Sequence, residues 1–485
     1  MTFFFYFSLH KKQMPKPTPE TLQRLKEIVG EKGFVGDERD MAPYLVERRD
    51  LYKGRAAAVL KPASVEEVSA IMKVAHEAAI HVVPQGGNTG LVGGQMPDGT
   101  GEEIVLSLSR MNRVRALDAE NNTLTVDAGV TLAAAQDAAA EADRLFPLSL
   151  ASEGSCQIGG NLATNAGGTQ VLRYGNARDL VLGLEVVLAN GDIWNGLTGL
   201  RKDNTGYDLR HLFMGSEGTL GIITGAVLKL FPRPRAVSTA FAAVPGVEAA
   251  VKLLRAADEI SGGQVTTFEL VPRIGIEFVT RHLEGASDPL PDISPWYVLI
   301  EMTAGTETAK LDETMEMALA EGLDTKLVTD AAIAQSETQR GDFRRLREAL
   351  SDVQRAEGGS IKHDVSVPVS RMADFIAAAT RAVSARLPGI RPVPFGHIGD
   401  GNVHFNLSQP VGADKDAFLA LWGEMNSIVH GIVREMGGSI SAEHGVGQLK
   451  RDEIAATKSP VEMALMRALK KALDPKGILN PGKVV

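Results

Sequence analysis

Three glycine-rich segments constrain the fold most strongly, because each one follows or precedes a short apolar stretch. They are PQGGNTGLVGG at 84–94, EGSCQIGGNLATNAGG at 153–168 and GSEGTLGIIT at 215–224. A predicted strand at 56–60, a helix that begins with the capping box Ser64–Glu67 and a strand at 82–83 precede the first segment. Successive backbone N–H groups in such loops bind anionic oxygen. A single loop of this kind is usually a plain turn, but three together predict a site for a long pyrophosphate-containing ligand.

Several common classes of protein do not fit the sequence. The chain has neither the G-x-G-x-x-G motif nor the P-loop motif, so an NAD enzyme of the common type is not expected. With 51 basic and 60 acidic residues the formal net charge is −9, which gives no reason to expect a nucleic-acid partner. Cys156 is the single cysteine. An internal disulfide is therefore excluded. We expect a protein of a reducing compartment, namely the cytoplasm, or one bound peripherally to a membrane.

The N-terminal stretch MTFFFYFSLHKKQ does not have the pattern of a membrane span or a signal peptide. Its apolar run is too short to cross a bilayer, and its lysines follow the run instead of preceding it. We expect either a disordered N-terminal tail or a protein whose translation starts at Met14.

Strands and helices alternate beyond residue 236, which predicts an α+β domain. Earlier in the chain, helical spacing predicts a helical lead-in at 18–50, and Asn121–Asn122 predicts a hairpin turn. The later strands are expected at 239–244, 265–270, 297–302 and 325–328, and the helices at 247–260, 273–284, 308–320 and 338–357.

Histidines and a carboxylate gather in two segments near the C-terminus. In GHIGDGNVHFNL, period-two alternation places His404 and Asn406 on one face of a strand, and His397 lies in the preceding turn. SAEHGVG adds Glu443 and His444. Two histidines and a carboxylate can hold a divalent metal ion with open positions, and His444 beside them suits a general base. Structural roles for these histidines are about equally compatible with the spacing alone.

The three glycine-rich segments resemble the FAD-binding loops of the vanillyl-alcohol-oxidase-type flavoproteins. GHIGDGNVHFN, SAEHGVG and LDPKGILNPGK resemble the C-terminal half of the FAD-linked D-2-hydroxy acid dehydrogenase branch. The resemblance covers residues 40–485 and implies an α+β fold: a two-subdomain FAD-binding domain, an α+β cap domain with an antiparallel sheet, and a C-terminal helical segment. The expected divisions are 1–50 (tail and lead-in), 51–233 (FAD-binding domain), 234–393 (cap) and 394–485 (metal and catalytic segment returning to the flavin).

The resemblance also implies a set of FAD-binding residues. Binding is expected to be noncovalent, because the first loop has no histidine to which FAD could be attached. The implied residues are Pro84, Gly86, Gly87, Asn88, Thr89, Gly90, Leu91, Gly154, Ser155, Gly159, Gly160, Asn161, Asn165, Gly167, Gly168, Glu217, Gly218, Ile223 and Asn480.

For the reaction centre, the resemblance implies metal ligands, a catalytic residue and substrate-binding residues. The metal, Zn²⁺ or Mn²⁺, is expected on His397, His404 and Glu443, with His444 as the catalytic base. The implied substrate-binding residues are Arg347, Ser351, Lys362 and Asn406.

The expected reaction is oxidation of a D-2-hydroxy acid to the 2-oxo acid. KHDVSVP, at 362–368, resembles the 2-hydroxyglutarate branch and favours D-2-hydroxyglutarate over D-lactate or glycolate. Arg273 and Arg281 are candidates for binding a second carboxylate. The expected electron acceptor is an electron-transfer flavoprotein or a quinone, and the expected assembly is a homodimer. A colourless metal-dependent hydrolase is the alternative from a different class.

Overall fold

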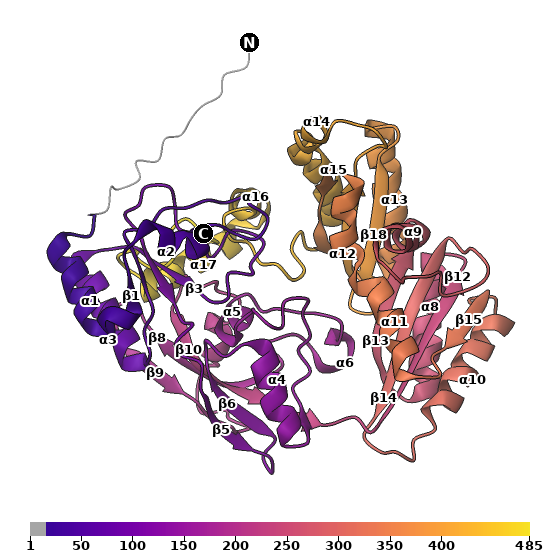
Figure 1. Ribbon diagram of the computed structural model, residues 1–485, viewed down its shortest axis with the longest axis horizontal. Helices are drawn as coiled ribbons and strands as arrows, with labels where there is room; N and C mark the ends of the chain where they lie inside the picture. Colours follow the sequence, from indigo (N-terminus) through magenta and orange to yellow (C-terminus); the bar gives the residue numbers. More distant parts are fainter. Residues whose placement is uncertain (1–15) are drawn as a thin grey trace.

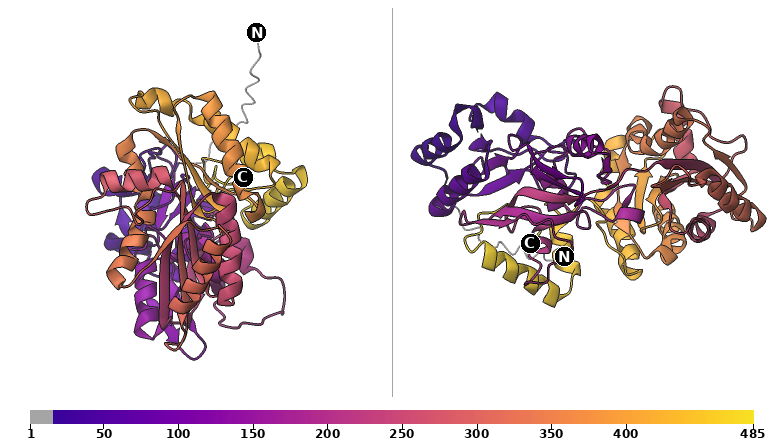
Figure 2. Two further views of the ribbon diagram at one scale, coloured as in Figure 1. Left: turned by 90° about the vertical axis from the view of Figure 1, so that its right-hand side faces the viewer. Right: turned by 90° about the horizontal axis from the view of Figure 1, so that it is seen from below.

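The computed structural model describes residues 16–485, which form two lobes (Figure 1). The chain leaves the first lobe after the short strand β11 (Phe231–Pro232) and enters the second with β12 (Ala236–Val244). Its last helices return to the first lobe, as the yellow ribbon shows in the right-hand view of Figure 2. The expectation about Met14 concerns residues outside the described range. No helix within 16–485 is long and apolar enough to cross a membrane.

The first sheet of the first lobe holds the first glycine-rich loop. Its strand order is β1-β2-β4-β3, and β4 pairs in parallel with both β2 and β3. The strands are almost wholly apolar, as expected of a sheet that is covered on both faces. The elements are α1 (Pro19–Gly33), β1 (Phe34–Val35), α2 (Glu38–Leu45), β2 (Ala58–Leu60), α3 (Val65–Ala78), β3 (Val82–Gln85) and β4 (Ile104–Ser107).

Helix α3 begins where the sequence predicted it. The Ser64 hydroxyl accepts the Glu67 N–H at 3.3 Å, and the Glu67 carboxylate accepts the N–H of Ala63 at 2.8 Å. These contacts satisfy N–H groups that the first helical turn leaves without partners. The helix then buries Val68, Ile71 and Met72 in the core of this lobe. The packing of α3 therefore fixes the position of strand β3, from which the loop at 84–94 begins.

The second sheet is antiparallel, in the order β5-β6-β10-β8-β9. The predicted hairpin is confirmed, since Asp118 pairs with Thr123 across the turn that contains Asn121 and Asn122. The strands are β5 (Val114–Asp118), β6 (Thr123–Asp127), β8 (Val181–Val187), β9 (Ile193–Gly196) and β10 (Ile222–Lys229). Short elements around them are α4 (Leu132–Glu141), β7 (Arg144–Leu145), α5 (Ile158–Ala163), α6 (Val171–Tyr174) and α7 (Arg210–Phe213).

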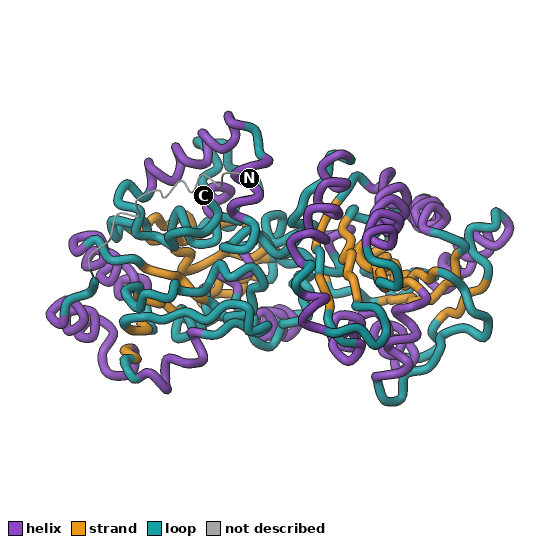
Figure 3. Tube along the Cα trace, turned by 90° about the horizontal axis from the view of Figure 1, so that it is seen from above, coloured by secondary structure: helices purple, strands orange, loops and turns teal. Residues whose placement is uncertain are grey.

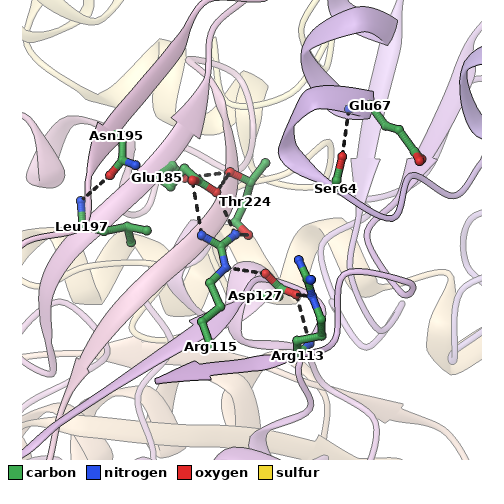
Figure 4. Close-up of polar contacts among 9 residues, drawn as sticks. All are labelled: Ser64, Glu67, Arg113, Arg115, Asp127, Glu185, Asn195, Leu197 and Thr224. Carbon is green, nitrogen blue, oxygen red and sulfur yellow. Dashed lines mark hydrogen bonds and ion pairs between the residues drawn. The ribbon is translucent and has the colours of Figure 1, made fainter. Parts of the chain in front are cut away.

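A buried ionic network ties four strands of this sheet together (Figure 4). Arg115 on β5 donates to Asp127 on β6 at 2.6 Å and to Glu185 on β8 at 2.8 Å. The hydroxyl of Thr224 on β10 donates to the same Glu185 carboxylate at 2.9 Å. Both carboxylates are almost fully buried, so the arginine supplies the charge that makes their burial tolerable.

The second lobe is built on an antiparallel sheet in the order β15-β12-β14-β13-β18-β19-β16, with β17 also paired to β19. The strands beyond β12 are β13 (Val265–Pro272), β14 (Trp296–Ala304), β15 (Asp330–Ile333), β16 (Ser360–Ile361), β17 (Asp364–Ser366), β18 (Arg391–His397) and β19 (Asn402–Ser408). The boundary expected between 393 and 394 lies inside β18, so β18 and β19 continue the cap sheet.

Helices cover both faces of this sheet (Figure 3). On one face lie α8 (Val247–Ser261), α10 (Leu311–Asp324), α13 (Met372–Arg386) and α15 (Trp422–Glu435), and on the other α9 (Arg273–His282), α11 (Glu337–Glu348) and α12 (Leu350–Val353). The helix expected at 338–357 is therefore divided, with a 3-10 turn at Gln354–Glu357. The remaining elements are η2 (Val369–Arg371), α14 (Lys415–Leu419), α16 (Arg451–Thr457) and α17 (Pro460–Leu473).

One predicted strand is wrong. Residues 325–328 close the C-terminus of α10, because the N–H groups of Leu327 and Val328 both donate to the carbonyl of Gly322, at 2.8 and 2.9 Å. The strand that pairs with β12 is β15, which begins at Asp330.

Candidate active site

His397, His404 and Glu443 meet at one point, although they come from two strands and a loop. His397 ends β18 and His404 lies on β19, and a short turn joins these paired strands. The Nε2 atoms of the two histidines lie 3.4 and 3.9 Å from the carboxylate oxygens of Glu443. One ligand atom from each residue falls within a 4.8 Å cluster, which is close enough for a single metal ion. The donor set fits a divalent transition metal with open positions.

Burial and the nearby carboxylates shift the pKa values of the two histidines in opposite directions. Burial lowers the pKa of His404 to about 4, so its ring is neutral at pH 7 and can act as a ligand. Burial acts in the same direction on His397, but Glu269 and Glu443 raise its pKa well above the usual value. Burial would raise the pKa of Glu443, yet the two histidines hold it below its usual value.

His444 follows Glu443 and is held by a buried carboxylate, Asp364, at the start of β17. One oxygen of Asp364 accepts the backbone N–H groups of Glu443 and His444, both at 3.0 Å, and lies 3.3 Å from Nδ1 of His444. The other oxygen accepts the side-chain amide of Asn402 at 3.0 Å. Burial would raise the pKa of Asp364, but His444 and Lys450 hold it far below the usual range. Asp364 therefore fixes the loop and the histidine ring together.

A cavity lies in the first lobe, and His444 is part of its wall. Many of the residues implied for FAD line it: Pro84, Gly86, Gly87, Asn88, Thr89, Gly90, Gly159, Gly160, Asn161, Glu217, Gly218 and Ile223. The structure adds Gln85, Val92, Gly94, Gln95, Leu108, Ala128, Gln157, Ala163, Thr164, Gly221 and Ile222.

The other residues implied for FAD lie behind or beside this wall. Gly154 and Ser155 are exposed, and Gly168 packs against the carbonyl of Ser149. The Leu91 carbonyl accepts from Arg49, and the Asn165 side chain accepts the N–H of Arg178. The residues implied for FAD that do not line the cavity are Leu91, Gly154, Ser155, Asn165, Gly167, Gly168 and Asn480.

Gly167 and Asn480 have positions that bear on the two centres. A Cβ at Gly167 would lie 3.6 Å from Oε1 of Glu443, so this loop backs the metal cluster more closely than the flavin cavity. The Asn480 side chain is 1% exposed and donates to the carbonyls of Gly94 and Glu217, which both line the cavity.

The cavity fits FAD on two observations. The buried side-chain oxygens of Gln85, Gln157 and Asn480 have no hydrogen-bond partner within the described residues, although buried polar atoms normally have one. Close packing of the loops is also required: a Cβ at Gly87 would lie 1.9 Å from the Ser155 carbonyl. One side of the first loop thus packs on the second glycine-rich segment, and the backbone on the side that lines the cavity can contact a ligand.

Glu217 lines the cavity, but its carboxylate serves another purpose. It accepts the backbone N–H groups of Val446 at 2.6 Å and Gly447 at 2.9 Å. Burial raises the pKa of Glu217 despite these bonds. The contact joins the third glycine-rich loop to the segment that carries His444.

The residues implied for substrate binding come together only in part. The Nε–H of Arg347, a buried residue, donates to Glu269 at 2.7 Å. Nζ of Lys362 donates to the carbonyl of Ser351, an exposed residue, at 2.9 Å. Asn406 is buried, and its amide donates to Gln354 at 2.8 Å.

Arg273 and Arg281, the candidates for binding a second carboxylate, are each paired with carboxylates of the cap. Arg273 pairs with Asp288 and Glu277, and Arg281 pairs with Glu357 at 2.6 Å. Glu269 and Asp364 belong to the site but were not among the residues expected from the sequence. A lone glutamate within the apolar strand VTTFELVP was the available signal for Glu269, since a buried carboxylate needs a partner.

Comparison with known proteins identifies the family. The profile of the FAD linked oxidases, C-terminal domain, matches residues 233–484, and that of the FAD binding domain matches residues 56–196. The chain belongs to the FAD-linked oxidases. This FAD-linked oxidase is thus an FAD-dependent oxidoreductase, and a colourless hydrolase is no longer a competing interpretation.

Curated relatives match the FAD-linked oxidase over most of its length. D-2-hydroxyglutarate dehydrogenase, mitochondrial, of Arabidopsis thaliana is 39% identical over 95% of this chain and 80% of its own. D-2-hydroxyglutarate dehydrogenase of Xanthomonas citri pv. viticola is 39% identical over 88% of this chain and 89% of its own. A crystal structure of p-cresol methylhydroxylase has a TM-score of 0.75 at 18% identity, covers 96% of both chains and supports the expected vanillyl-alcohol-oxidase-type α+β fold.

Proposed function

We propose that this chain oxidises D-2-hydroxyglutarate to 2-oxoglutarate, with noncovalently bound FAD and with Zn²⁺ or Mn²⁺ at the substrate. The observation that carries the proposal is the position of His444, which lines the FAD cavity and directly follows Glu443 of the metal-type cluster. Relatives named D-2-hydroxyglutarate dehydrogenases, at about 40% identity over most of the chain, support this substrate.

Each proposed group has a separate role in the oxidation. FAD held by the glycine-rich loops would supply the hydride acceptor for C2, and a divalent metal held by His397, His404 and Glu443 would supply the charge that lowers the pKa of the C2 hydroxyl. Because Asp364 holds Nδ1 of His444, Nε2 is the atom that accepts the hydroxyl proton. Arg347 and Lys362 supply positive charge for carboxylate groups, and Ser351 and Asn406 supply polar contacts.

D-lactate and glycolate are the alternative substrates within the family. They lack the second carboxylate, so they would gain less from a cationic pocket. Lys362 offers such a positive charge: burial, with Arg355 and Arg49 nearby, lowers its pKa to about 8.

The remaining expectations stay proposals. The acceptor of the flavin's electrons is an electron-transfer flavoprotein or a quinone, because the chain has no dinucleotide motif. The assembly is a homodimer. The cytoplasm is the proposed location, since a single, buried cysteine suits a reducing compartment.

Removal of the metal tests the role of the cluster. After dialysis against a chelator, the protein should keep its flavin absorption band but lose reduction of the flavin by D-2-hydroxyglutarate by about 100-fold or more, because the hydroxyl pKa is no longer lowered. Added Zn²⁺ or Mn²⁺ should restore the rate. An unchanged rate in protein shown to be metal-free would contradict the metal-assisted part of the proposal.

A further inference from the structure

Two side chains with different proposed tasks share one buried partner, Glu269. One carboxylate oxygen of Glu269 lies 2.5 Å from Nδ1 of His397, a proposed metal ligand. The other oxygen accepts Nε–H of Arg347, a proposed substrate-binding residue, at 2.7 Å. Glu269 is 1% exposed, so both contacts are shielded from water.

The fold places these three residues together through strand register and one helix. Glu269 on β13 is the direct cross-strand partner of His397 on β18 in the antiparallel pairing. Directly opposed residues in such a pair have their side chains on the same face of the sheet. Helix α11 brings Arg347 to this face, where its guanidinium carbon lies 4.9 Å from the centre of the Phe395 ring.

Each contact with Glu269 leaves other nitrogen atoms of the partner available: Nε2 of His397 and the Nη groups of Arg347. Glu269 holds Nδ1 of His397, so the ring presents Nε2, which lies 3.4 Å from Glu443 in the metal-type cluster. A metal-bound histidine commonly donates its other N–H to a carboxylate, which orients the ring and raises its basicity. The contact with Arg347 uses Nε, so the paired Nη groups are left for a carboxylate ligand.

We propose that Glu269 is a positioning residue that sets the metal ligand His397 and the substrate-binding Arg347 at the same time. The inference rests on the proposed function for the roles of those two residues. It adds that metal binding and carboxylate recognition share one buried support, so loss of Glu269 weakens both.

The carboxylate is required because both of its oxygens accept. In Glu269→Gln, one acceptor is replaced by an NH₂ group that faces a donor, either Nε–H of Arg347 or Nδ1–H of His397. A buried donor without an acceptor is costly, so one of the two side chains is expected to move.

The chain offers a matched control in Glu301. It lies on the neighbouring strand β14, is also buried, and accepts from Arg344 of the same helix at 2.7 Å and from Thr239 at 2.9 Å. It contacts neither histidine of the cluster. Glu301→Gln therefore removes an ion pair to the same helix from the same sheet, with a more exposed arginine, without touching His397 or Arg347.

The test measures binding without turnover in the FAD-loaded, full-length protein. Zn²⁺ affinity is measured by competition with a chromophoric chelator, and 2-oxoglutarate affinity by the change in the flavin spectrum of metal-loaded protein. For Glu269→Gln we expect Zn²⁺ binding about 10- to 100-fold weaker and 2-oxoglutarate binding at least about tenfold weaker. Glu301→Gln should change each by less than about threefold.

Wild-type affinity for either ligand in Glu269→Gln would overturn the shared support, as would equal losses in both variants. Circular dichroism and flavin content establish that each variant folds. If Glu269→Gln does not fold, Glu269→Asp carries the test: it keeps the charge but shortens the reach, and Zn²⁺ binding should still fall at least about threefold. A wild-type protein that binds no Zn²⁺ would instead count against the metal in the proposed function.

Discussion

At the scale of single residues, the buried carboxylate of Asp364 orients His444, the proposed base. Asp364 accepts two backbone N–H groups of the loop and lies 3.3 Å from Nδ1 of His444. Asp364→Asn removes the negative charge that would stabilise the His444 imidazolium formed when the ring accepts a proton. We expect flavin reduction to slow by about 10- to 100-fold, measured by stopped-flow absorbance at saturating substrate.

The loss in Asp364→Asn should occur in the rate of reduction more than in substrate affinity. A rate within twofold of wild type would show that Asp364 only supports the backbone. His444→Asn is the reference variant, with an expected loss of about 10²–10⁴-fold, since it removes the base itself.

Lys362 gives the proposed substrate site a specific pH dependence. Burial, together with Arg355 and Arg49, lowers the pKa of Lys362 to about 8. The ammonium group is therefore charged below pH 8 and neutral above it. Binding of 2-oxoglutarate should weaken by up to about tenfold between pH 7 and pH 9, measured by flavin difference spectra.

The control for this pH dependence is Lys362→Met, in which the inflection near pH 8 should disappear and binding should be weak throughout. If the wild-type inflection persists in Lys362→Met, another group is responsible. A dissociation constant that does not change between pH 7 and pH 9 in the wild-type protein would contradict the assignment of Lys362.

At the scale of elements, the antiparallel sheet of the first lobe depends on its buried ionic network. Arg115 pairs with both Asp127 and Glu185, which are almost fully buried. Arg115→Ala leaves two carboxylates without this partner and should lower the free energy of unfolding by roughly 3–5 kcal/mol. Urea unfolding at fixed excess FAD measures the change.

Arg113 is the matched control for Arg115. It also contacts Asp127, at 3.2 Å, but its side chain is 69% exposed, so Arg113→Ala should cost less than about 1 kcal/mol. Equal losses for the two arginines would show that burial of the carboxylates does not determine the strength of the network.

Local patterns in the sequence predicted most elements, but not contacts between distant segments. Helix α3 and the hairpin of β5 and β6 follow from capping, periodicity and turn residues. Residues 325–328 have the composition of a strand, yet the N–H groups of Leu327 and Val328 donate to the carbonyl of Gly322 and close α10. The left-handed residue of this helix end is Lys326, with φ 60°, so the glycine that usually signals such an end is missing from the sequence.

The same limit applies to the candidate site. Alternation along VHFNL and the adjacency of Glu443 and His444 predicted the cluster, because those relations are local. Glu269 reaches His397 through strand register across 128 positions, and Glu217 reaches Val446 across 229. No spacing within one segment reveals such pairs. The expected roles of Arg347 and Lys362 came from the family resemblance, because charged side chains are otherwise expected at the protein surface.

At the scale of the whole molecule, the proposed reaction centre lies where the two lobes meet. The metal-type cluster is built on the cap sheet, whereas the flavin cavity lies in the first lobe. The segment from Glu443 to Gly447 connects them, since Asp364 of the cap holds its start and Glu217 of the first lobe holds its end. His444 is thereby fixed between the proposed metal and the proposed flavin.

The most direct test of the central claim is an anaerobic titration of the FAD- and metal-loaded protein, first with D-2-hydroxyglutarate and then with D-lactate. The visible flavin band reports reduction. We predict rapid, stoichiometric bleaching by D-2-hydroxyglutarate and reduction at least about tenfold slower by D-lactate, because only the former offers a second carboxylate to Arg347 and Lys362. Bleaching by D-lactate alone, or by neither acid, would contradict it.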